Sequence, residues 1–349
     1  MGDRGACNPR HISTADGTDL VFGYTGLLAK PGPSSASLTE FFDGKMRHIT
    51  LDYRNRVCKA MNFISRNLDQ DLSLGEIAEA ASFSMFHFHR IFKAVVGENV
   101  AGFKRRLRLE SGANRLIAFP HKDITSIALA CGFSNSQSFA KAFRQHFGST
   151  PSQFRKSKIG HNVSKNGSEF SIQTQYDPDT VFTSKPETGI KINLDVKVKT
   201  MPEYHVAYVR KLGNYDKQTH DAAFDELMQW AVPRGYTDSG INFGLYWDNP
   251  DVTPEGKCRI DACISVPAGT IPEGQIGIQT ISGGPYAVMH ENVLNDTFKE
   301  SWELLFKWIV QKGYEFTHIP NYQIYLNDGK VHPQGTWIVD ICVPLRSGN

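Results

Sequence analysis

The sequence lacks the features that mark membrane-spanning and secreted proteins. Its 349 residues contain no apolar run near the roughly 18 residues that a membrane-spanning helix needs. The N-terminus has no basic segment followed by an apolar core, so we expect no signal peptide. The six cysteines form no Cys-x-x-Cys pair and lie mostly in apolar patterns, which indicates reduced, buried thiols. We therefore expect a cytoplasmic protein that has no membrane partner.

Common catalytic and metal-binding motifs are missing as well. The sequence has no His-Glu-x-x-His motif and no Ser-His-Asp or Cys-His pattern. His87 and His89 are two residues apart on an expected helix, so they cannot face one metal ion together. We predict no catalytic residue, no metal ligand and no cofactor, and hence no enzyme.

What the sequence does have is an uneven distribution of charge. Residues 46–158 hold 18 Lys and Arg against 8 Asp and Glu, a net charge of +10. Residues 159–349 hold 16 against 23, a net charge of −7, although the whole chain is only +2. A basic domain beside an acidic one indicates a polyanionic partner for the first domain alone.

Residues 123–154 carry the pattern of a helix-turn-helix. The first expected helix has apolar side chains at i, i+3, i+4 and i+7, namely Ile124, Ile127, Ala128 and Cys131. Gly132 then permits the left-handed turn that ends this helix. The second expected helix has Phe139, Phe143 and Phe147 along one side, and Gln137, Lys141, Arg144 and Gln145 on the other. A glycine turn before a helix with a polar, basic outer face is typical of DNA-binding units.

A second unit of this kind precedes the first. Apolar spacing predicts helices over residues 51–68, 74–81 and 84–96, and Ser73 and Glu76 are placed as a capping box. The outward face of the last helix carries Phe86, His89, Arg90 and Lys93. An exposed ring can contact thymine methyl groups, and arginine can pair with guanine or phosphate. The alternative is that Phe86 packs on a neighbouring helix.

The run over residues 123–155 resembles the AraC/XylS family of bacterial transcription regulators. The matching residues are Ile127, Ala128, Gly132, Phe133, Phe139, Phe143, Arg144, Phe147, Gly148, Pro151, Phe154 and Arg155. The resemblance implies binding to double-stranded DNA, with RNA polymerase as a further partner. It places at the bases the positions held here by Phe86, His89, Arg90, Ser136, Gln137 and Lys141.

In this family a helix over residues 102–119 would join the two units and hold both recognition helices on one side. Its cations, Lys104, Arg105, Arg106 and Arg108, would contact phosphates, which positions a protein on DNA without specifying sequence. The alternative is a solvated face. Residues 1–45 and 159–189 are rich in small and polar residues. We interpret the first as a disordered tail or a non-native leader rather than an ordered element, and the second as a linker.

From residue 190 the pattern changes to alternating strands with an internal repeat. Trp230-x3-Arg234-Gly235-Tyr236 is echoed by Trp308-x3-Lys312-Gly313-Tyr314, at an offset of 78 residues. Each half predicts strand, helix, strand, strand, with first strands over residues 192–209 and 275–291. We therefore expect a multidomain protein in which an all-α domain (46–158) precedes an α+β domain (190–349). The second domain would be a curved antiparallel sheet with two helices and a groove near its pseudo-twofold axis.

Residues 190–349 resemble the GyrI-like domain, which binds small molecules. The resemblance rests on three groups of residues: Gly213-Asn214-Tyr215, Gly244-Leu245-Tyr246-Trp247-Asp248 and the tail Asp340-Ile341-Cys342-Val343-Pro344. Many members carry a pocket glutamate two residues before the tyrosine that matches Tyr325, but this chain has Gln323. An amide cannot compensate a buried cation, so we expect a neutral aromatic effector. The expected lining is Tyr208, Tyr246, Trp247, Trp308, Gln323, Tyr325 and Trp337, each of which has core packing as its alternative.

Together these patterns predict a sequence-specific transcription regulator whose activity depends on a small molecule in the C-terminal domain. The alternatives are a GyrI-like hydrolase or a sequestering protein fused to a DNA-binding domain. Hydrolysis would need a positioned carboxylate to activate water, which Gln323 does not supply. Sequestration alone would leave the basic domain unexplained.

Overall fold

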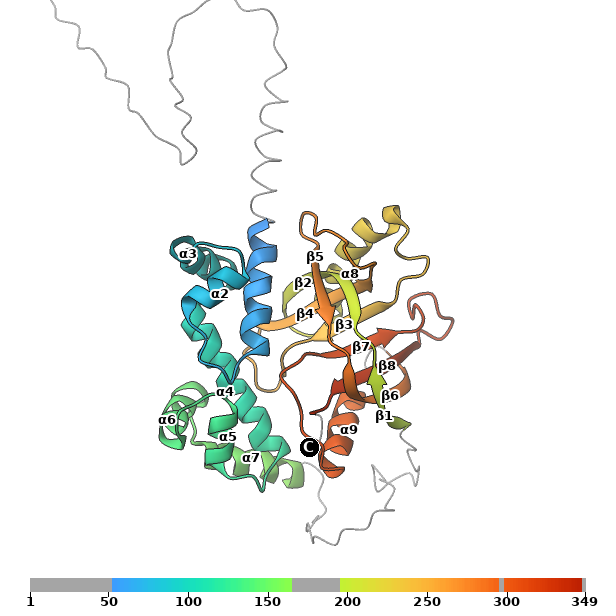
Figure 1. Cartoon of the computed structure of the whole chain (residues 1–349). Helices are drawn as coiled ribbons and strands as arrows, with labels where there is room; N and C mark the ends of the chain where they lie inside the picture. The colour runs from blue at the N-terminus through green and yellow to red at the C-terminus, as the bar shows by residue number, and fades with distance from the viewer. Residues whose placement is uncertain (1–51, 165–194, 295–297, 347–349) are drawn as a thin grey trace, which may run out of the picture. The chain divides into compact units, whose positions relative to one another are not determined.

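The computed structural model describes residues 52–164, 195–294 and 298–346 (Figure 1). The expected tail over residues 1–45 lies outside this part of the chain, as does the expected linker from residue 165 onward. The described residues form a helical region followed by a region built on one sheet, as the sequence predicts.

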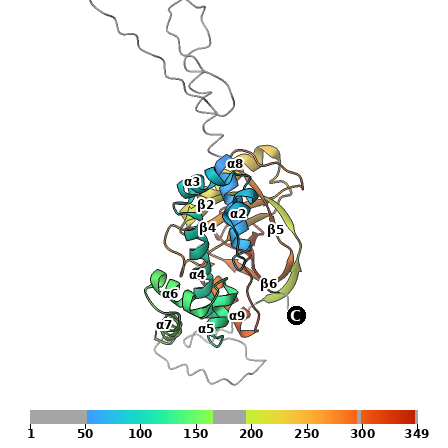
Figure 2. The same ribbon diagram turned by 60° about the vertical axis from the view of Figure 1, so that its left-hand side comes forward.

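The helical region begins with a helix over residues 52–66, called helix 52–66 below. Six more helices follow: α2 (Leu74–Ala80), α3 (Met85–Val96), α4 (Val100–Ala118), α5 (Ile124–Ala130), α6 (Ser136–Phe147) and α7 (Pro151–Ser164). In Figures 1 and 2, α4 runs from the α2–α3 pair to the α5–α6 pair. One correction concerns α7, which continues to Ser164 and so occupies the start of the expected linker.

Each helix-turn-helix has its own core, and α4 contributes to both. Phe88, Phe92 and Phe103 are fully buried in the first core. Phe139 and Phe143 are fully buried in the second. Because these rings recur at helical spacing, the remaining side chains of α3 and α6 are directed outward.

The helix boundaries follow from capping residues that the sequence contains. The Ser73 hydroxyl accepts from the Glu76 amide while the Glu76 carboxylate accepts from the Ser73 amide, which confirms the predicted capping box. Gly132 has a φ of +78°, and a Cβ at this position would lie 2.6 Å from the Leu68 carbonyl oxygen. The turn of the second unit therefore requires glycine.

The second region is an eight-stranded antiparallel sheet in the order β1-β6-β8-β7-β3-β4-β2-β5. Its strands are β1 (Val196–Met201), β2 (Tyr204–Gly213), β3 (Asn242–Tyr246), β4 (Cys258–Ser265), β5 (Gly277–Ile281), β6 (Gly284–Val293), β7 (Asn321–Tyr325) and β8 (Trp337–Pro344). Its α-helices are α8 (Lys217–Ala231) and α9 (Phe298–Gln311). The two halves meet where β3 pairs with β7, with Gly244 opposite Gln323.

The repeat contains one more strand per half than the sequence predicts. The expected single strand over residues 192–209 is two strands, β1 and β2, separated at Pro202. Proline has no amide hydrogen for the ladder, so it interrupts pairing there. Likewise, the expected strand over residues 275–291 is split into β5 and β6 before Gly284, whose φ is +132°. Each half is therefore β-β-α-β-β.

Both faces of the sheet are buried. Ala207 and Ile264 pack with α8, and Met289 and Ile341 pack with α9. The opposite face contains a separate aromatic and aliphatic core: Val206, Tyr208, Phe243, Leu245, Cys263, Ile281, Tyr286, Val288, Tyr322, Ile324 and Cys342. Successive residues of a strand point to opposite faces, so each strand contributes to both cores.

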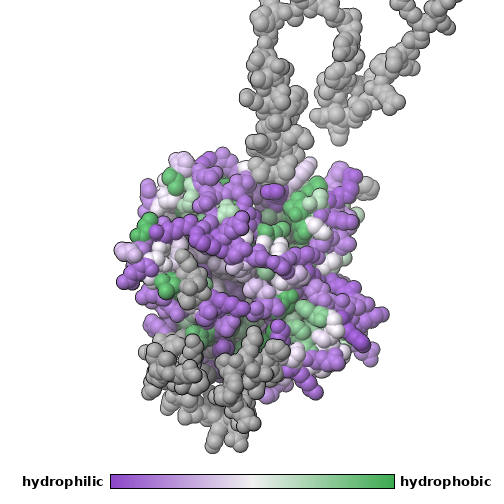
Figure 3. Space-filling model, turned by 180° about the vertical axis from the view of Figure 1, so that it is seen from behind, coloured by the Kyte–Doolittle hydropathy of each residue, from purple (hydrophilic) through white to green (hydrophobic). Residues whose placement is uncertain are grey.

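The surface is mostly polar. The side shown in Figure 3 is predominantly hydrophilic, with hydrophobic residues in small separate groups. Among the described helices, none combines the length and hydropathy required to span a bilayer.

Candidate nucleic-acid interface and small-molecule site

The outward faces of α3 and α6 are polar and basic. On α3, His89, Arg90 and Lys93 are exposed, while Phe88 and Phe92 on the inner face are fully buried. Phe86 also lies on α3, but its side chain is outside the described part of the structure. On α6 the outward residues are Gln137, Lys141 and Arg144, which are exposed, and Ser136, which is partly buried. The predicted positions are thus available to a large anionic partner.

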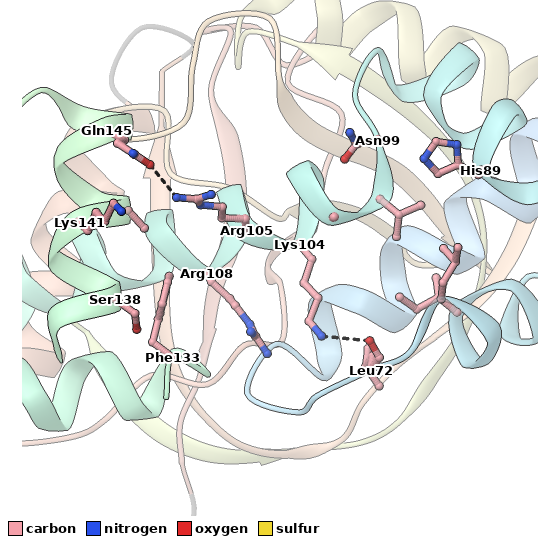
Figure 4. A pocket seen from close by; sticks show the side chains of 15 residues that line it. Leu72, His89, Asn99, Lys104, Arg105, Arg108, Phe133, Ser138, Lys141 and Gln145 are labelled. Carbon is pink, nitrogen blue, oxygen red and sulfur yellow. Dashed lines mark hydrogen bonds between the residues drawn. The ribbon is translucent and has the colours of Figure 1, made fainter. Parts of the chain in front are cut away.

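A cleft with a volume of about 880 Å³ lies between the two units (Figure 4). α3 contributes His89 to its lining, and α6 contributes Ser138 and Lys141. From α4 come three cations: Lys104, Arg105 and Arg108. One continuous hollow therefore connects both predicted recognition helices across α4, with an excess of positive charge.

The cations of α4 differ in their contacts. Arg105 is exposed and donates to the Gln145 Oε1 atom of α6 over 2.9 Å (Figure 4). The Lys104 ammonium donates to the Leu72 carbonyl over 3.3 Å. Arg108 donates to backbone carbonyls that follow helix 52–66, at Leu68 and Gln70, over 2.6 and 2.8 Å. Of the three, Arg105 is the exposed one, and its single printed side-chain bond leaves other donors free for a phosphate.

Arg106 is not placed as the sequence predicted. Its side chain is 6% exposed and forms ion pairs with Glu98 (2.8 Å) and Glu110 (3.0 Å). Burial raises the pKa of Glu110, and the Arg106 charge opposes that rise. A guanidinium enclosed by two carboxylates is not available to DNA, so the expected phosphate contact of Arg106 is corrected to a structural role. The i, i+4 spacing of Arg106 and Glu110 was the sequence signal for this pair.

In the C-terminal region, four polar side chains gather on the face of the sheet that α8 covers. We call Tyr246, Gln323, Tyr325 and His220 the tyrosine–glutamine cluster. Both tyrosine hydroxyls donate to Gln323 Oε1, over 2.9 Å from Tyr246 and 3.1 Å from Tyr325. His220 Nε2 lies 2.8 Å from the Tyr325 hydroxyl. The Gln323 side chain is 1% exposed, and within the described residues its Nε2 has no hydrogen-bond partner.

Gly244 makes room for this arrangement. A Cβ at this position would lie 2.9 Å from the Tyr325 hydroxyl and 3.1 Å from the Tyr246 hydroxyl. Since Gly244 pairs with Gln323 across the centre of the sheet, the cluster sits where the two halves of the repeat meet. This is the predicted position near the pseudo-twofold axis.

Aromatic rings surround the cluster. Trp302 of α9 lies 5.6 Å from the Tyr246 ring, and Phe224 of α8 lies 5.5 Å from the Tyr325 ring. Trp337 of β8 lies 5.4 Å from the Tyr325 ring on another side. These distances are typical of packed aromatic pairs, and a flat apolar ligand would meet similar ring faces.

The cluster is uncharged at neutral pH. Burial lowers the pKa of His220 to about 4, so its imidazole is neutral. Burial raises the pKa of Tyr246 to about 12, and it raises the pKa of Tyr325 as well. Gln323 has no charge to contribute. Its free Nε2 group is a hydrogen-bond donor, so the chemistry of the cluster favours a neutral acceptor.

The predicted ligand residues divide between two locations. Tyr246, Gln323, Tyr325 and Trp337 are brought together, but Tyr208 lies in the core of the opposite face. Trp247 is also separate, because its Nε1 donates to Asp261, which pairs with Arg210. Trp308 stacks on Tyr314, with 6.1 Å between centroids. The structure therefore does not support Tyr208, Trp247 and Trp308 as members of one site with the cluster.

The sequence analysis missed several residues of this site. His220 and Phe224 lie four residues apart on α8, and Trp302 lies on α9. The i, i+4 spacing of His220 and Phe224 indicated a shared helical face. It did not indicate which face of the sheet that helix covers.

Comparisons with known proteins match the two regions separately. A family model described as a GyrI-like small molecule binding domain matches residues 194–346, and one described as a helix-turn-helix domain matches residues 61–157. A DNA gyrase inhibitor from Escherichia coli (strain K12) is 31% identical over 162 residues, which is 44% of this chain and 98% of that protein. A DNA gyrase inhibitor 2 from Dickeya dadantii (strain 3937) is 30% identical over 153 residues, or 42% and 93% of the two chains.

Among solved structures, the chain is similar to a transcriptional regulator from Chromobacterium violaceum described as containing an AraC-type DNA-binding domain. The sequence identity is 30% and the TM-score is 0.28. The match covers 30% of this chain and 91% of that one.

Proposed function

Because the chain belongs to the AraC-type helix-turn-helix regulators with a C-terminal GyrI-like domain, we propose that a neutral aromatic effector controls its binding to double-stranded DNA. The protein is a DNA-binding transcription regulator whose activity a small molecule modulates. In this proposal the effector occupies the tyrosine–glutamine cluster, and α3 and α6 engage DNA. The proposal includes a cytoplasmic location and a contact with RNA polymerase.

The proposed DNA contacts fall into two classes. The outward residues of α3 and α6 face base edges: Phe86, His89, Arg90, Ser136, Gln137 and Lys141. Arg105, Lys93 and Arg144 contact phosphates, because long exposed cations beside the cleft can reach the backbone between two successive major grooves. The support for this division is the exposure of these side chains and the cleft that connects them.

The observation that carries the effector proposal is the state of Gln323. Its amide oxygen accepts from two tyrosines, while its buried Nε2 has no partner within the described residues. A buried donor without an acceptor costs free energy, which a ligand carbonyl or hydroxyl would recover by accepting from it. A cationic ligand would bring another donor and no acceptor, so a neutral acceptor-bearing aromatic compound fits better.

The same residue favours binding over turnover. A hydrolase of this fold would need a carboxylate near the ligand to activate water, and the amide of Gln323 cannot accept a proton at neutral pH. The His220 imidazole is neutral, but it is hydrogen-bonded to Tyr325 rather than free. We therefore expect the effector to leave the protein chemically unchanged.

The proposal can be tested by selection and linkage. Duplexes selected from a random pool should bind the full chain more tightly than scrambled duplexes by about a thousandfold or more. A saturating effector should change that affinity, by about 5- to 150-fold. A protein that selects no sequence, or whose DNA affinity ignores every ligand of the C-terminal region, would contradict the proposed function.

A further inference from the structure

Tyr215 lies between the tyrosine–glutamine cluster and a buried arginine. Its ring packs edge-on against Tyr246, with 5.2 Å between the centroids. Its hydroxyl donates to the Arg259 carbonyl oxygen over 2.9 Å and accepts from the Asp248 amide over 3.0 Å. One side chain thus contacts the cluster through its ring and the backbone around Arg259 through its hydroxyl.

Arg259 in turn contacts the DNA-binding helices. Its side chain is 2% exposed and forms two hydrogen bonds to Asp248, from Nε over 2.8 Å and from Nη2 over 2.6 Å. The remaining Nη1 donates to the Ser65 hydroxyl of helix 52–66 over 2.7 Å. The guanidinium also lies over the Phe103 ring of α4, at 5.5 Å from its centroid. A fully buried charge therefore joins the sheet to both helices.

A second set of contacts leads from the same strand end to helix 52–66. Trp247 follows Tyr246 directly, and its Nε1 donates to Asp261 over 2.8 Å. Asp261 also accepts from Gln279 over 2.8 Å, and the Gln279 oxygen accepts from Asn62 of helix 52–66 over 2.9 Å. A displacement at Tyr246 thus affects two routes to one helix.

We propose that Tyr215 is the positioning residue that couples the tyrosine–glutamine cluster to the DNA-binding helices. The inference rests on the proposed function and adds the route by which the effector acts. A ligand against the Tyr246 ring shifts the Tyr215 ring, and the Tyr215 hydroxyl carries the backbone of Asp248 and Arg259 with it. The contacts of Arg259 with Ser65 and Phe103 then change. Because these groups are buried, a small shift breaks a contact instead of stretching it.

The test uses the full chain without ligand or DNA and measures hydrogen–deuterium exchange. Tyr215→Phe keeps the ring against Tyr246 and removes the two hydroxyl hydrogen bonds. Amides of helix 52–66 should exchange about two- to tenfold faster in this variant, since one hydrogen bond shifts an opening equilibrium by that factor. The matched control is Asn327→Ala, which also removes two backbone hydrogen bonds, to Thr336 and Ile338, but contacts none of these residues.

A reciprocal arm keeps the inference testable if Tyr215→Phe fails to fold. Ser65→Ala should speed exchange over residues 247–259, whereas Ser157→Ala, whose hydroxyl bonds to the Phe154 carbonyl, should not. Faster exchange confined to the mutated region in either variant would overturn the coupling role. That outcome would leave the proposed function standing, because DNA selection tests it separately.

Discussion

The Tyr246 hydroxyl donates to the Gln323 side-chain oxygen over 2.9 Å, directly across the junction of the two repeat halves. The residues come from adjacent strands, β3 and β7, and their hydrogen bond lies above Gly244. Tyr325 donates to the same oxygen. The amide is therefore fixed in orientation, with its Nε2 group left as the free donor.

Gln323→Glu should exchange the ligand preference of the cluster. The carboxylate can still accept from both tyrosines, so the local geometry is kept while a buried negative charge is added. We expect the variant to gain affinity for hydrophobic cations, through charge and ring faces together. The parent should bind neutral aromatic compounds at least as well as cations. Calorimetric titration with naphthalene-2-carboxamide and the naphthalen-2-ylmethylammonium ion compares the two classes on one ring system.

The control for this substitution is Gln334→Glu, which adds the same charge at an exposed position. It should leave both affinities unchanged. Tight binding of the cation by the parent, unaltered in Gln323→Glu, would show that Gln323 does not set the charge preference.

Arg90→Ala and Arg105→Ala should differ in how they weaken DNA binding. Arg90→Ala should cost about 1–3 kcal/mol on selected duplexes and relax the sequence preference, as expected for a contact to a base edge. Arg105→Ala should weaken selected and random duplexes alike and lower the salt dependence by about one unit of slope. Affinities measured over a salt series separate the two effects, with Lys312→Ala as a charge-removal control in the C-terminal region. Identical behaviour of the two variants would refute the division into base and phosphate contacts.

Arg106→Ala should act on folding instead. The substitution leaves Glu98 and Glu110 without their buried partner, so the free energy of unfolding should fall by about 3–5 kcal/mol. The adjacent Arg105→Ala removes an exposed side chain and should change it by less than about 0.5 kcal/mol. Denaturant unfolding measures both. A stable Arg106→Ala protein with a reduced salt dependence of DNA binding would restore the original phosphate interpretation.

Stability should depend on pH through His220. Its folded-state pKa is about 4, below the ordinary value of 6.5, so protons bind more readily to the unfolded chain. The contribution is complete above about pH 6.5 and is lost as the pH falls toward 4, reaching about 2 kcal/mol at pH 5. His220→Gln, which cannot titrate, should lose correspondingly less stability between pH 7.5 and pH 5. Unfolding curves at the two pH values would contradict this if the variant matched the parent, or if the exposed His121→Gln gave the same change.

Local patterns predicted most of the fold and half of the site. Phenylalanines at helical spacing identified the buried faces of α3 and α6, and therefore the outward residues as well. Strand parity did not show which core each face of the sheet meets, so Tyr208 was grouped with Tyr246 although they face opposite ways. Arg106 was misjudged because its partner Glu98 precedes α4, and burial of that pair depends on tertiary packing.

The central claim is that one chain uses both helix-turn-helix units on one site, and hydroxyl-radical footprinting tests it most directly. The full chain on a duplex selected from a random pool should protect two patches about 34 Å apart, one turn of B-DNA. The site should be asymmetric and saturate with one chain per duplex. Protection of a single groove, or binding that appears only with a second copy, would contradict the account.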